Sequence, residues 1–362
     1  MQALVLVGGE GTRLRPLTAT APKPALALVD RPFMRYMIDW LARHGVDEVI
    51  LACGFLPDKL EAALGHGEGG GPTIRYLAEP ERRGTAGAIK FAEPYLEGRF
   101  LALNGDVLSD LDLSALIARH EAAGARSTLA LYPVADPSAY GLVRRRDDGE
   151  IIEFLEKPDP DEIDTDEISA GAYVLERDVL DLIAPDREVS IEREVFPLLV
   201  GNGLYAERLE GYWMDIGTPE RFLQASWDII DGAVESEPGA RARAASGVVI
   251  EPGAVVDPSA EISAPAYIGA GAELAAGVRL SNGAVVGAGS TVAAGASISG
   301  SILFDGCAIG PRCRVERSIL AASVRIAEDA HIAEGSVLGE GALVSAGATP
   351  GPGARIESGV AA

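Results

Sequence analysis

Aliphatic residues recur every six positions through the last third of the chain, and this period constrains the fold more than any other feature. The repeated positions are Ile250, Val256, Ile262, Ile268, Leu274, Leu280, Val286, Val292, Ile298, Leu303, Ile309, Val315, Leu320, Ile326, Ile332, Leu338 and Val344. The register slips by one residue at Leu303 and again at Leu320. A period of six fits neither an α-helix nor an ordinary strand pair, but it fits a parallel β-helix in which three hexads form one coil. About 100 residues then give roughly five to six coils.

These repeats resemble the left-handed β-helix of hexapeptide-repeat proteins, many of which are acyltransferases, so the repeat alone defines no function. Acyl-transfer members usually rely on a histidine in the coils. Here the sequence offers His331, at an ordinary turn-adjacent position where a surface residue is expected. Cys307 and Cys313 take the small-residue place of successive hexads, which favours packing. We therefore expect a module for structure and assembly, without acyltransferase activity, in a chain that forms a homo-oligomer.

Residues 1–230 alternate short apolar runs with amphipathic segments. Strands are predicted at 3–7, 48–53, 73–77, 99–103 and 150–155, and helices at 33–43, 58–64 and 86–92. This alternation predicts an α/β domain, a Rossmann-like mixed sheet with helices on both faces. Residues 231–247 are small, polar and without periodicity, which favours a linker. The predicted order is thus an α/β domain at 1–230, a linker at 231–247 and a β-helix domain at 248–362.

The charge of the chain limits its partners. A net charge of −23 argues against nucleic acid and anionic membranes. No apolar run approaches the roughly 20 residues that span a bilayer, and three cysteines without a Cys-x-x-Cys pair fit a reducing cytosol. We expect a cytoplasmic protein. The first 35 residues, however, carry five basic side chains against two acidic ones. This cationic cluster suits a small phosphorylated ligand.

The first chemical motif is GGEGTRLRPLT at 8–18, followed by Pro22-Lys23-Pro24. It begins where the first strand ends, the usual place for a ligand in an open α/β sheet. Its glycines let backbone N–H groups approach phosphate oxygens, and Arg13 and Lys23 add full charges. The motif is neither G-x-G-x-x-G, because Leu14 takes the third glycine position, nor a P-loop, because Lys23 lies between prolines.

Two carboxylates follow predicted strands far apart in the sequence. Asp106 ends Asn104-Gly105-Asp106, and Asp215 lies in Trp213-Met214-Asp215-Ile216-Gly217-Thr218. Either alone could be a turn residue. Together they could hold one Mg²⁺, which prefers oxygen ligands and keeps water and substrate phosphates in its shell.

Residues 8–24 match throughout the opening motif of the nucleoside-diphosphate-sugar pyrophosphorylase family, G-G-x-G-T-R-L-x-P-L-T with a downstream P-K-P, and the resemblance extends over 1–230. It implies a sugar-1-phosphate nucleotidyltransferase, which joins a nucleoside triphosphate to a sugar-1-phosphate and releases pyrophosphate. By this resemblance, Arg13 and Lys23 are catalytic together with the Mg²⁺ ligands Asp106 and Asp215. The implied nucleotide-binding residues are Gly8, Gly9, Gly11, Thr12, Arg13, Glu79, Gly84 and Thr85.

The resemblance also implies a sugar-phosphate site. The glutamate of Glu156-Lys157-Pro158 would contact sugar hydroxyls and its lysine the sugar phosphate. The remaining implied positions are Gly141, Ser169 and Gly171. Ser169 departs from the family, which usually has asparagine there. Because serine is shorter and has one hydroxyl, this difference leaves the exact sugar open.

By the same resemblance, the base would be read near EPERRGTAG at 79–87, where thymidylyl- and uridylyltransferases of the family commonly have glutamine in place of Glu79. A carboxylate only accepts hydrogen bonds, which favours guanine with its paired N1–H and N2–H₂ donors. The segments 84–87 and 190–197 also look like those of mannose-1-phosphate guanylyltransferases. We therefore expect GTP and mannose-1-phosphate as substrates. The alternatives are a glucose-1-phosphate thymidylyl-, uridylyl- or adenylyltransferase, and a regulatory homologue that binds a nucleotide sugar without turnover.

Overall fold

The computed structural model describes residues 1–67, 70–156 and 159–361. Contacts divide the chain into two compact units. Unit 1 comprises Met1–Gly9 and Met34–Trp213, and unit 2 comprises Glu10–Phe33 and Met214–Ala362. The first loop therefore belongs to the same unit as the C-terminal repeats. The domain boundaries inferred from the sequence stay a prediction.

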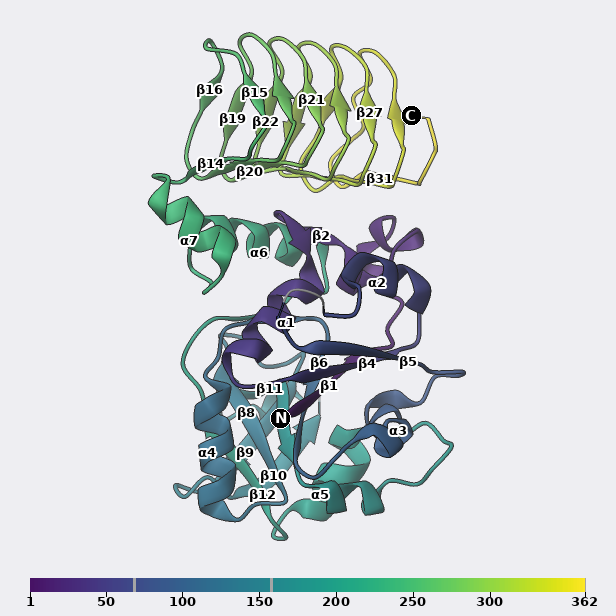
Figure 1. The fold of residues 1–362 in the computed structure, drawn as a ribbon, viewed down its shortest axis with the longest axis vertical. Helices are drawn as coiled ribbons and strands as arrows, with labels where there is room; N and C mark the ends of the chain where they lie inside the picture. The colour runs from purple at the N-terminus through teal and green to yellow at the C-terminus, as the bar shows by residue number, and fades with distance from the viewer. Residues whose placement is uncertain (68–69, 157–158, 362) are drawn as a thin grey trace. The chain divides into compact units, whose positions relative to one another are not determined.

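A mixed sheet forms the centre of unit 1 (Figure 1). Within the described residues its nine strands are β1 (Gln2–Val7), β4 (Glu48–Cys53), β5 (Thr73–Ala78), β6 (Phe100–Asn104), β8 (Ser127–Pro133), β9 (Gly141–Arg145), β10 (Ile151–Glu156), β11 (Glu167–Leu175) and β12 (Leu204–Arg208). Strand β1 is parallel to β4 and β6, and β4 is parallel to β5. Strand β11 runs antiparallel to β6, β8 and β9. The predicted mixed α/β sheet is confirmed.

Helices cover both faces of this sheet, as predicted. They are α1 (Phe33–Arg43), α2 (Pro57–Leu64), α3 (Gly84–Phe91), α4 (Leu113–Ala123) and α5 (Phe196–Leu199). In β8, Thr128 hydrogen-bonds His120 of α4, while the next residue, Leu129, lies in one apolar cluster with Ile89 of α3 and Phe196 of α5. Because successive strand residues point to opposite faces, α4 covers one face and α3 and α5 cover the other.

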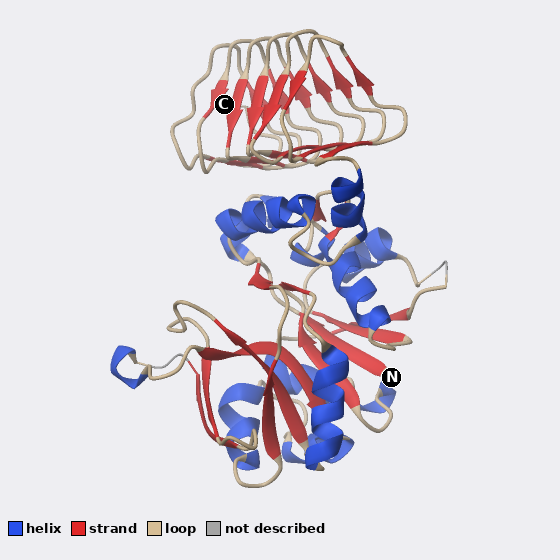
Figure 2. Ribbon diagram, turned by 90° about the vertical axis from the view of Figure 1, so that its left-hand side faces the viewer, coloured by secondary structure: helices blue, strands red, loops and turns tan. Residues whose placement is uncertain are grey.

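The C-terminal repeats form a parallel β-helix, whose stacked coils are drawn in Figure 2. As far as the chain is described, three sheets run along it. The first comprises β14 (Val248–Ile250), β17 (Ala266–Ile268), β20 (Ala284–Val286), β23 (Ile302–Leu303), β26 (Ile319–Leu320), β29 (Val337–Leu338) and β31 (Arg355–Ile356). The second comprises β15 (Val255–Val256), β18 (Glu273–Leu274), β21 (Thr291–Val292), β24 (Ala308–Ile309), β27 (Arg325–Ile326) and β30 (Leu343–Val344). The third comprises β16 (Glu261–Ile262), β19 (Arg279–Ser281), β22 (Ser297–Ser299), β25 (Arg314–Glu316) and β28 (His331–Ile332).

Strand pairing explains the two slips in the six-residue period. Val286 pairs with Leu303 and Leu303 with Leu320, so these two coils are one residue shorter than the coil that joins Ile268 to Val286. The periodic aliphatic residues from Ile268 to Val344 fill the interior, together with Cys307 and Cys313. In the first coil Val256 and Ile262 are only partly buried, and Ile250 is exposed. The packing role predicted for both cysteines is confirmed. His331 is partly exposed, and its Nε2 lies 3.1 Å from Glu316 Oε2.

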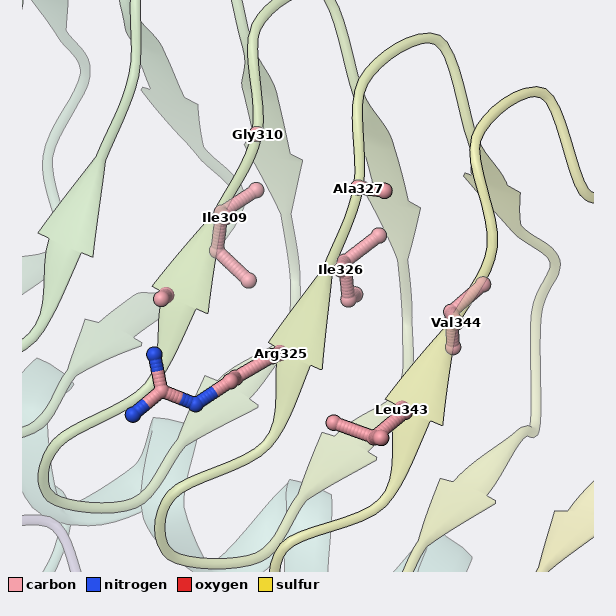
Figure 3. Close-up of a pocket in the computed structure, with 8 residues that line it drawn as sticks. Ile309, Gly310, Arg325, Ile326, Ala327, Leu343 and Val344 are labelled. Carbon is pink, nitrogen blue, oxygen red and sulfur yellow. The ribbon is translucent and has the colours of Figure 1, made fainter. Parts of the chain in front are cut away.

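A shallow groove of about 330 Å³ follows the second sheet over β24, β27 and β30 (Figure 3). Its lining residues are Ala308, Ile309, Gly310, Arg325, Ile326, Ala327, Leu343 and Val344. The lining is apolar except for Arg325, so the groove offers none of the side chains usual in nucleophilic or acid–base catalysis. In the described part of the chain, no helix is long and apolar enough to cross a membrane.

Two helices precede the coils in unit 2. Helix α6 (Pro219–Asp231) begins at Thr218, whose hydroxyl accepts from the Arg221 N–H, and α7 (Glu237–Ala244) begins at the similar cap Ser236. Helix α7 packs on α6 and β14 and lies inside the segment predicted as a linker. That segment is therefore partly helical. The remaining short strands are β2 (Ala27–Leu28), β3 (Arg31–Pro32), β7 (Val107–Ser109) and β13 (Trp213–Asp215).

Trp227 of α6 joins this helix to the coils. Its ring lies over the Arg317 guanidinium, 4.9 Å from the ring centre, and against Gly283 and Gly300. Gly300 and Arg317 lie in the two shortened turns, between β22 and β23 and between β25 and β26. Each of the two shortened turns thus contributes one residue that contacts the Trp227 ring.

We expect Gly283→Ala to lower the free energy of unfolding by about 2–4 kcal/mol. Gly283 has a φ of +81°, and a Cβ there would lie 3.0 Å from Trp227 Cγ. The measurement is the urea midpoint followed by circular dichroism. Gly271→Ala is the matched control, because Gly271 has a φ of +66° but no atom within 4 Å of a Cβ. Equal losses in the two variants would show that the tryptophan contact contributes nothing.

Candidate active site

The loop after β1 carries the predicted triphosphate residues. It folds into three short 3₁₀ turns, Thr12–Leu14, Leu17–Ala19 and Lys23–Ala25. Gly11 has a left-handed φ of +61°, and a Cβ there would lie 3.0 Å from Thr18 Cγ2 and 3.3 Å from Lys23 Cβ. Thr18 Oγ1 also donates to the Gly11 carbonyl at 2.9 Å. Glycine at position 11 therefore lets the loop close on itself.

Asp215 lies among two cationic side chains and a backbone N–H of unit 2. Its Oδ1 accepts from the Gly217 N–H at 2.8 Å and lies 4.0 Å from Lys23 Nζ, while its Oδ2 accepts from Arg221 at 3.2 Å. A Cβ on Gly217 would overlap the Arg13 guanidinium and lie 2.8 Å from Asp215 Oδ1. The structure thus brings together Arg13, Lys23 and Asp215, three of the four predicted catalytic residues.

Asp106 lies at the carboxyl edge of the sheet in unit 1, in the turn between β6 and β7. The adjacent Gly105 donates its N–H to the Leu6 carbonyl at 2.9 Å, and a Cβ on Gly105 would overlap Val7. Asp106 and Asp215 belong to different units. Their joint binding of one metal ion therefore stays a prediction.

Glu79 lies at the same edge, just beyond β5. Its N–H donates to the Cys53 carbonyl at 2.8 Å, and its Oε1 lies 3.3 Å from where a Cβ of Gly8 would be. Burial raises the pKa of the Glu79 carboxyl, and the positive charge of Arg83 partly opposes this shift. The predicted base reader is thus a partly buried carboxylate beside the first glycine of the motif. Gly9 has open space around a Cβ.

Gly84 and Thr85 open α3 and contact residues 189–192. Gly84 has a φ of +67°, and a Cβ there would lie 2.6 Å from the Val189 carbonyl oxygen. Thr85 Oγ1 donates to Glu192 Oε2 at 2.8 Å and accepts from the Ile191 N–H at 2.8 Å. The Thr85 hydroxyl is thus engaged by this segment, to which the sequence analysis assigned no function. The nucleotide-binding roles of both residues stay predictions.

The predicted sugar residues come from β9, β10 and β11. A Cβ on Gly141 would lie 3.1 Å from Glu156 Oε2, so these two residues are close. Ser169 and Gly171 lie in β11, where the pairing with β8 is irregular between Ser169 and Tyr173. Gly171 has a φ of +72° and packs on the Asn104 amide. Lys157 lies outside the described residues.

Three aromatic side chains lie beside this region. Tyr140, next to the predicted Gly141, matches a sugar-pocket position of the family, whereas Tyr132 and Trp213 were given no role by the sequence analysis. Trp213 stacks on Tyr132, with ring centres 5.7 Å apart, and meets Tyr140 edge-on at 5.4 Å. Its Nε1 donates to the Ala170 carbonyl at 2.8 Å. The only signal in the sequence was the position of Trp213, two residues before Asp215.

Comparison with known proteins addresses the family directly. The family described as nucleotidyl transferase matches residues 2–232, and one described as GMPPB C-terminal domain matches 244–345. The chain belongs to the nucleotidyl transferase family. It is a sugar-1-phosphate nucleotidyltransferase with a C-terminal β-helix, as the motifs predicted.

Several relatives are similar over roughly two thirds of the chain. A mannose-1-phosphate guanylyltransferase from Mycobacterium tuberculosis is 41% identical over 263 residues, which is 70% of this chain and 72% of the relative. A mannose-1-phosphate guanyltransferase from Candida albicans is 42% identical over 233 residues, 62% and 64% of the two chains.

Solved structures resemble the nucleotidyl transferase at the level of the fold. HddC from Yersinia pseudotuberculosis is 27% identical with a TM-score of 0.54, covering 62% of this chain and 97% of its own. A putative glucose-1-phosphate thymidylyltransferase from Bacillus anthracis is 23% identical with a TM-score of 0.57, covering 62% and 94%. The second likeness shows the fold alone.

We expect Gly217→Ala to lower the kcat of this nucleotidyl transferase about 10- to 100-fold, because the added methyl displaces the flexible end of Arg13 from its place beside Asp215. Pyrophosphate release measures the effect, and the urea midpoint should change little. Gly351→Ala is the control in the same unit, since a Cβ there has no neighbour within 4 Å. An unchanged kcat in Gly217→Ala would contradict the role assigned to this arrangement.

Proposed function

We propose that the enzyme converts GTP and mannose-1-phosphate into GDP-mannose and pyrophosphate. The observation that carries this proposal is the Glu79 carboxylate, partly buried beside Gly8 at the carboxyl edge of the sheet. The names of the relatives from Mycobacterium tuberculosis and Candida albicans support the same substrates.

The base argument depends on hydrogen-bond donors and acceptors. An ionised carboxylate offers acceptors only, and guanine presents N1–H and N2–H₂ side by side. Thymine and uracil present one N–H between two carbonyl groups, so a carboxylate would oppose one of those carbonyls. Such an unpaired contact in a partly buried site is costly. Glu79 therefore favours guanine over thymine and uracil.

The proposed reaction is in-line attack of a sugar-phosphate oxygen on the α-phosphorus, with pyrophosphate as the leaving group. The new bond joins that oxygen to the α-phosphorus, and the bond to the β-phosphate oxygen breaks. A sugar phosphate is already ionised, so no general base is required. Arg13 and Lys23 would stabilise the charge on the triphosphate and on the departing pyrophosphate, and Lys157 would orient the sugar phosphate.

Asp106 and Asp215 are the proposed Mg²⁺ ligands, in line with a family that typically uses this ion. Both carboxylates lie at strand ends or in the turn that follows, and Asp215 lies beside the cationic side chains of Lys23 and Arg221. Mg²⁺ commonly takes one or two carboxylates and completes its shell with phosphates and water. When bound, Mg²⁺ would neutralise phosphate charge.

A cytoplasmic location and a homo-oligomeric state remain part of the proposal.

Pyrophosphate release with Mg²⁺ tests the substrates. GTP, ATP, UTP, CTP and dTTP are each combined with mannose-1-phosphate and glucose-1-phosphate. Release with GTP and mannose-1-phosphate is expected. Release only with dTTP or UTP would keep the class of enzyme and refute the Glu79 argument, whereas no release from any pair would favour the regulatory homologue.

A pH series tests Glu79 itself. The KM for GTP should rise as the pH falls toward the raised pKa of Glu79, because the protonated carboxyl loses one acceptor position. Glu79→Gln should raise the KM for GTP about tenfold at neutral pH and remove this extra pH dependence. The γ-phosphate titrates in both proteins, so the difference between them isolates Glu79. Parallel profiles in the two proteins would contradict the assignment.

A further inference from the structure

Glu192 lies on a short π-helix, η7 (Ile191–Val195), that contacts both α3 and β10. These neighbours carry residues from different parts of the predicted site, Thr85 on α3 and Glu156 at the end of β10. A π-helical turn is rare and is frequently found at functional sites. Its position between the two elements makes Glu192 a candidate for contact with a substrate.

Two hydroxyl groups hold the Glu192 side chain in place. Its Oε2 accepts from Thr85 Oγ1 at 2.8 Å and from Ser190 Oγ at 2.7 Å. Thr85 Oγ1 in turn accepts from the Ile191 N–H. Two donors on one carboxylate oxygen fix its orientation far better than solvent would, because charge-assisted hydrogen bonds are strong and short. Glu192 is thus pre-oriented, as a specificity residue needs to be.

The fully buried Tyr173 connects Glu192 to the predicted sugar residues. Burial raises the pKa of its hydroxyl well above the ordinary range, and the nearby charges of Glu192 and Glu156 raise it further. Tyr173 also hydrogen-bonds Glu192, whereas Glu156 acts on it through its charge. The Tyr173 ring packs on Phe196 at 5.1 Å, and Phe196 packs on Phe154 of β10 at 5.5 Å.

Ser169 adds a buried hydroxyl with incomplete hydrogen bonding at the same place. Its hydrogen bond to the Tyr173 hydroxyl partly opposes the rise in the pKa of Tyr173, but within the described residues its Oγ has no partner of full hydrogen-bond geometry. Buried hydroxyl groups normally have such a partner. A sugar hydroxyl beside Ser169 would supply it.

We propose that Glu192 is a specificity-determining residue for the sugar, accepting a hydrogen bond from a ring hydroxyl of a hexose 1-phosphate together with Glu156. Thr85 and Ser190 are its positioning residues. This inference rests on the proposed nucleotidyl transfer to a sugar phosphate but not on the identity of the base. Sites built to bond a hydroxyl discriminate strongly against analogues that lack it, because their polar groups are then left unpaired.

Glu192→Gln tests the proposal against a series of deoxy sugars. The variant should raise the KM for mannose-1-phosphate about tenfold, while the KM for GTP changes less than about threefold. The 2-, 3- and 4-deoxy analogues are then compared in both proteins. For the analogue that lacks the contacted hydroxyl, wild type and variant should have equal kcat/KM. A difference that persists with every analogue, or an equal loss for GTP and sugar, would overturn the proposal.

Control variants separate recognition from local structure. Glu194→Gln changes a glutamate on the same turn, which accepts from the Ser190 N–H and from Arg187 instead, so the KM ratio of the two substrates should stay as in wild type. Ser190→Ala removes a donor to Glu192 Oε2 and should reproduce the sugar-specific KM increase of Glu192→Gln, whereas Ser190→Thr, which keeps the hydroxyl, should have the wild-type KM. An increase in Ser190→Thr as large as that in Ser190→Ala would contradict the positioning role.

The two proposals fail in distinguishable ways. If wild type prefers another nucleotide or sugar phosphate, the proposed substrates are wrong, and the Glu192 comparison is made with deoxy analogues of the sugar phosphate that is consumed. If GDP-mannose is formed but Glu192→Gln shows no sugar-specific effect, only the present inference is wrong. If no sugar phosphate is turned over, both are wrong.

Discussion

The burial of Lys23 is the constraint on which unit 2 depends. Its side chain is 8% exposed, and an ammonium group so far from water needs a nearby negative charge. Asp215, almost 200 residues later, supplies that charge and also accepts from Arg221 and from the Gly217 N–H. Removing one partner of such a pair leaves an uncompensated charge, at a cost of about 3–5 kcal/mol. The first loop therefore packs with the segment that leads into α6 and the coils, and the same contact places Arg13 beside a carboxylate.

In unit 1 the corresponding constraint is the close approach of backbone segments at the carboxyl edge of the sheet. Gly105 fits against Leu6 and Val7, and Gly84 fits against Val189, in spaces that a methyl group would fill. These approaches bring the ends of β1 and β6 into contact and join α3 to the segment that carries Glu192. Once α3 is seated, Thr85 has no freedom to turn its hydroxyl elsewhere, because Glu192 and the Ile191 N–H engage it from both sides. The missing side chains of Gly84 and Gly105 thus permit the close packing that holds neighbouring side chains such as Thr85 rigidly in place.

The sequence predicted what local pattern determines and missed what distant contacts determine. Helix α1 and strand β4 have the predicted bounds, and the two register slips correspond to coils shortened by one residue. The helix α7 was missed because Pro238 and Gly239 disrupt its periodicity, although Ser236 offered a cap. The contacts of Trp227 with Gly283, Gly300 and Arg317, and the hydrogen bond of Glu192 with Thr85, join residues 56 to 107 positions apart, which no local pattern encodes. Of the predicted site, Arg13, Lys23 and Asp215 do meet in the structure, but their catalytic roles still rest on the family motif and await the experiments above.

Under the proposed function, the two sets of contacts divide substrate handling between regions that need not change together. Lys23 and Asp215, with Arg13 beside them, would serve chemistry common to every nucleoside triphosphate, and substitutions there would affect all substrates alike. Glu79, Ser169 and Glu192 lie in unit 1, whereas Arg13, Lys23 and Asp215 lie in unit 2. Substitutions at sites without common contacts are close to additive in free energy. We therefore expect a change of base or sugar preference to arise in unit 1 without altering the residues proposed to handle phosphate.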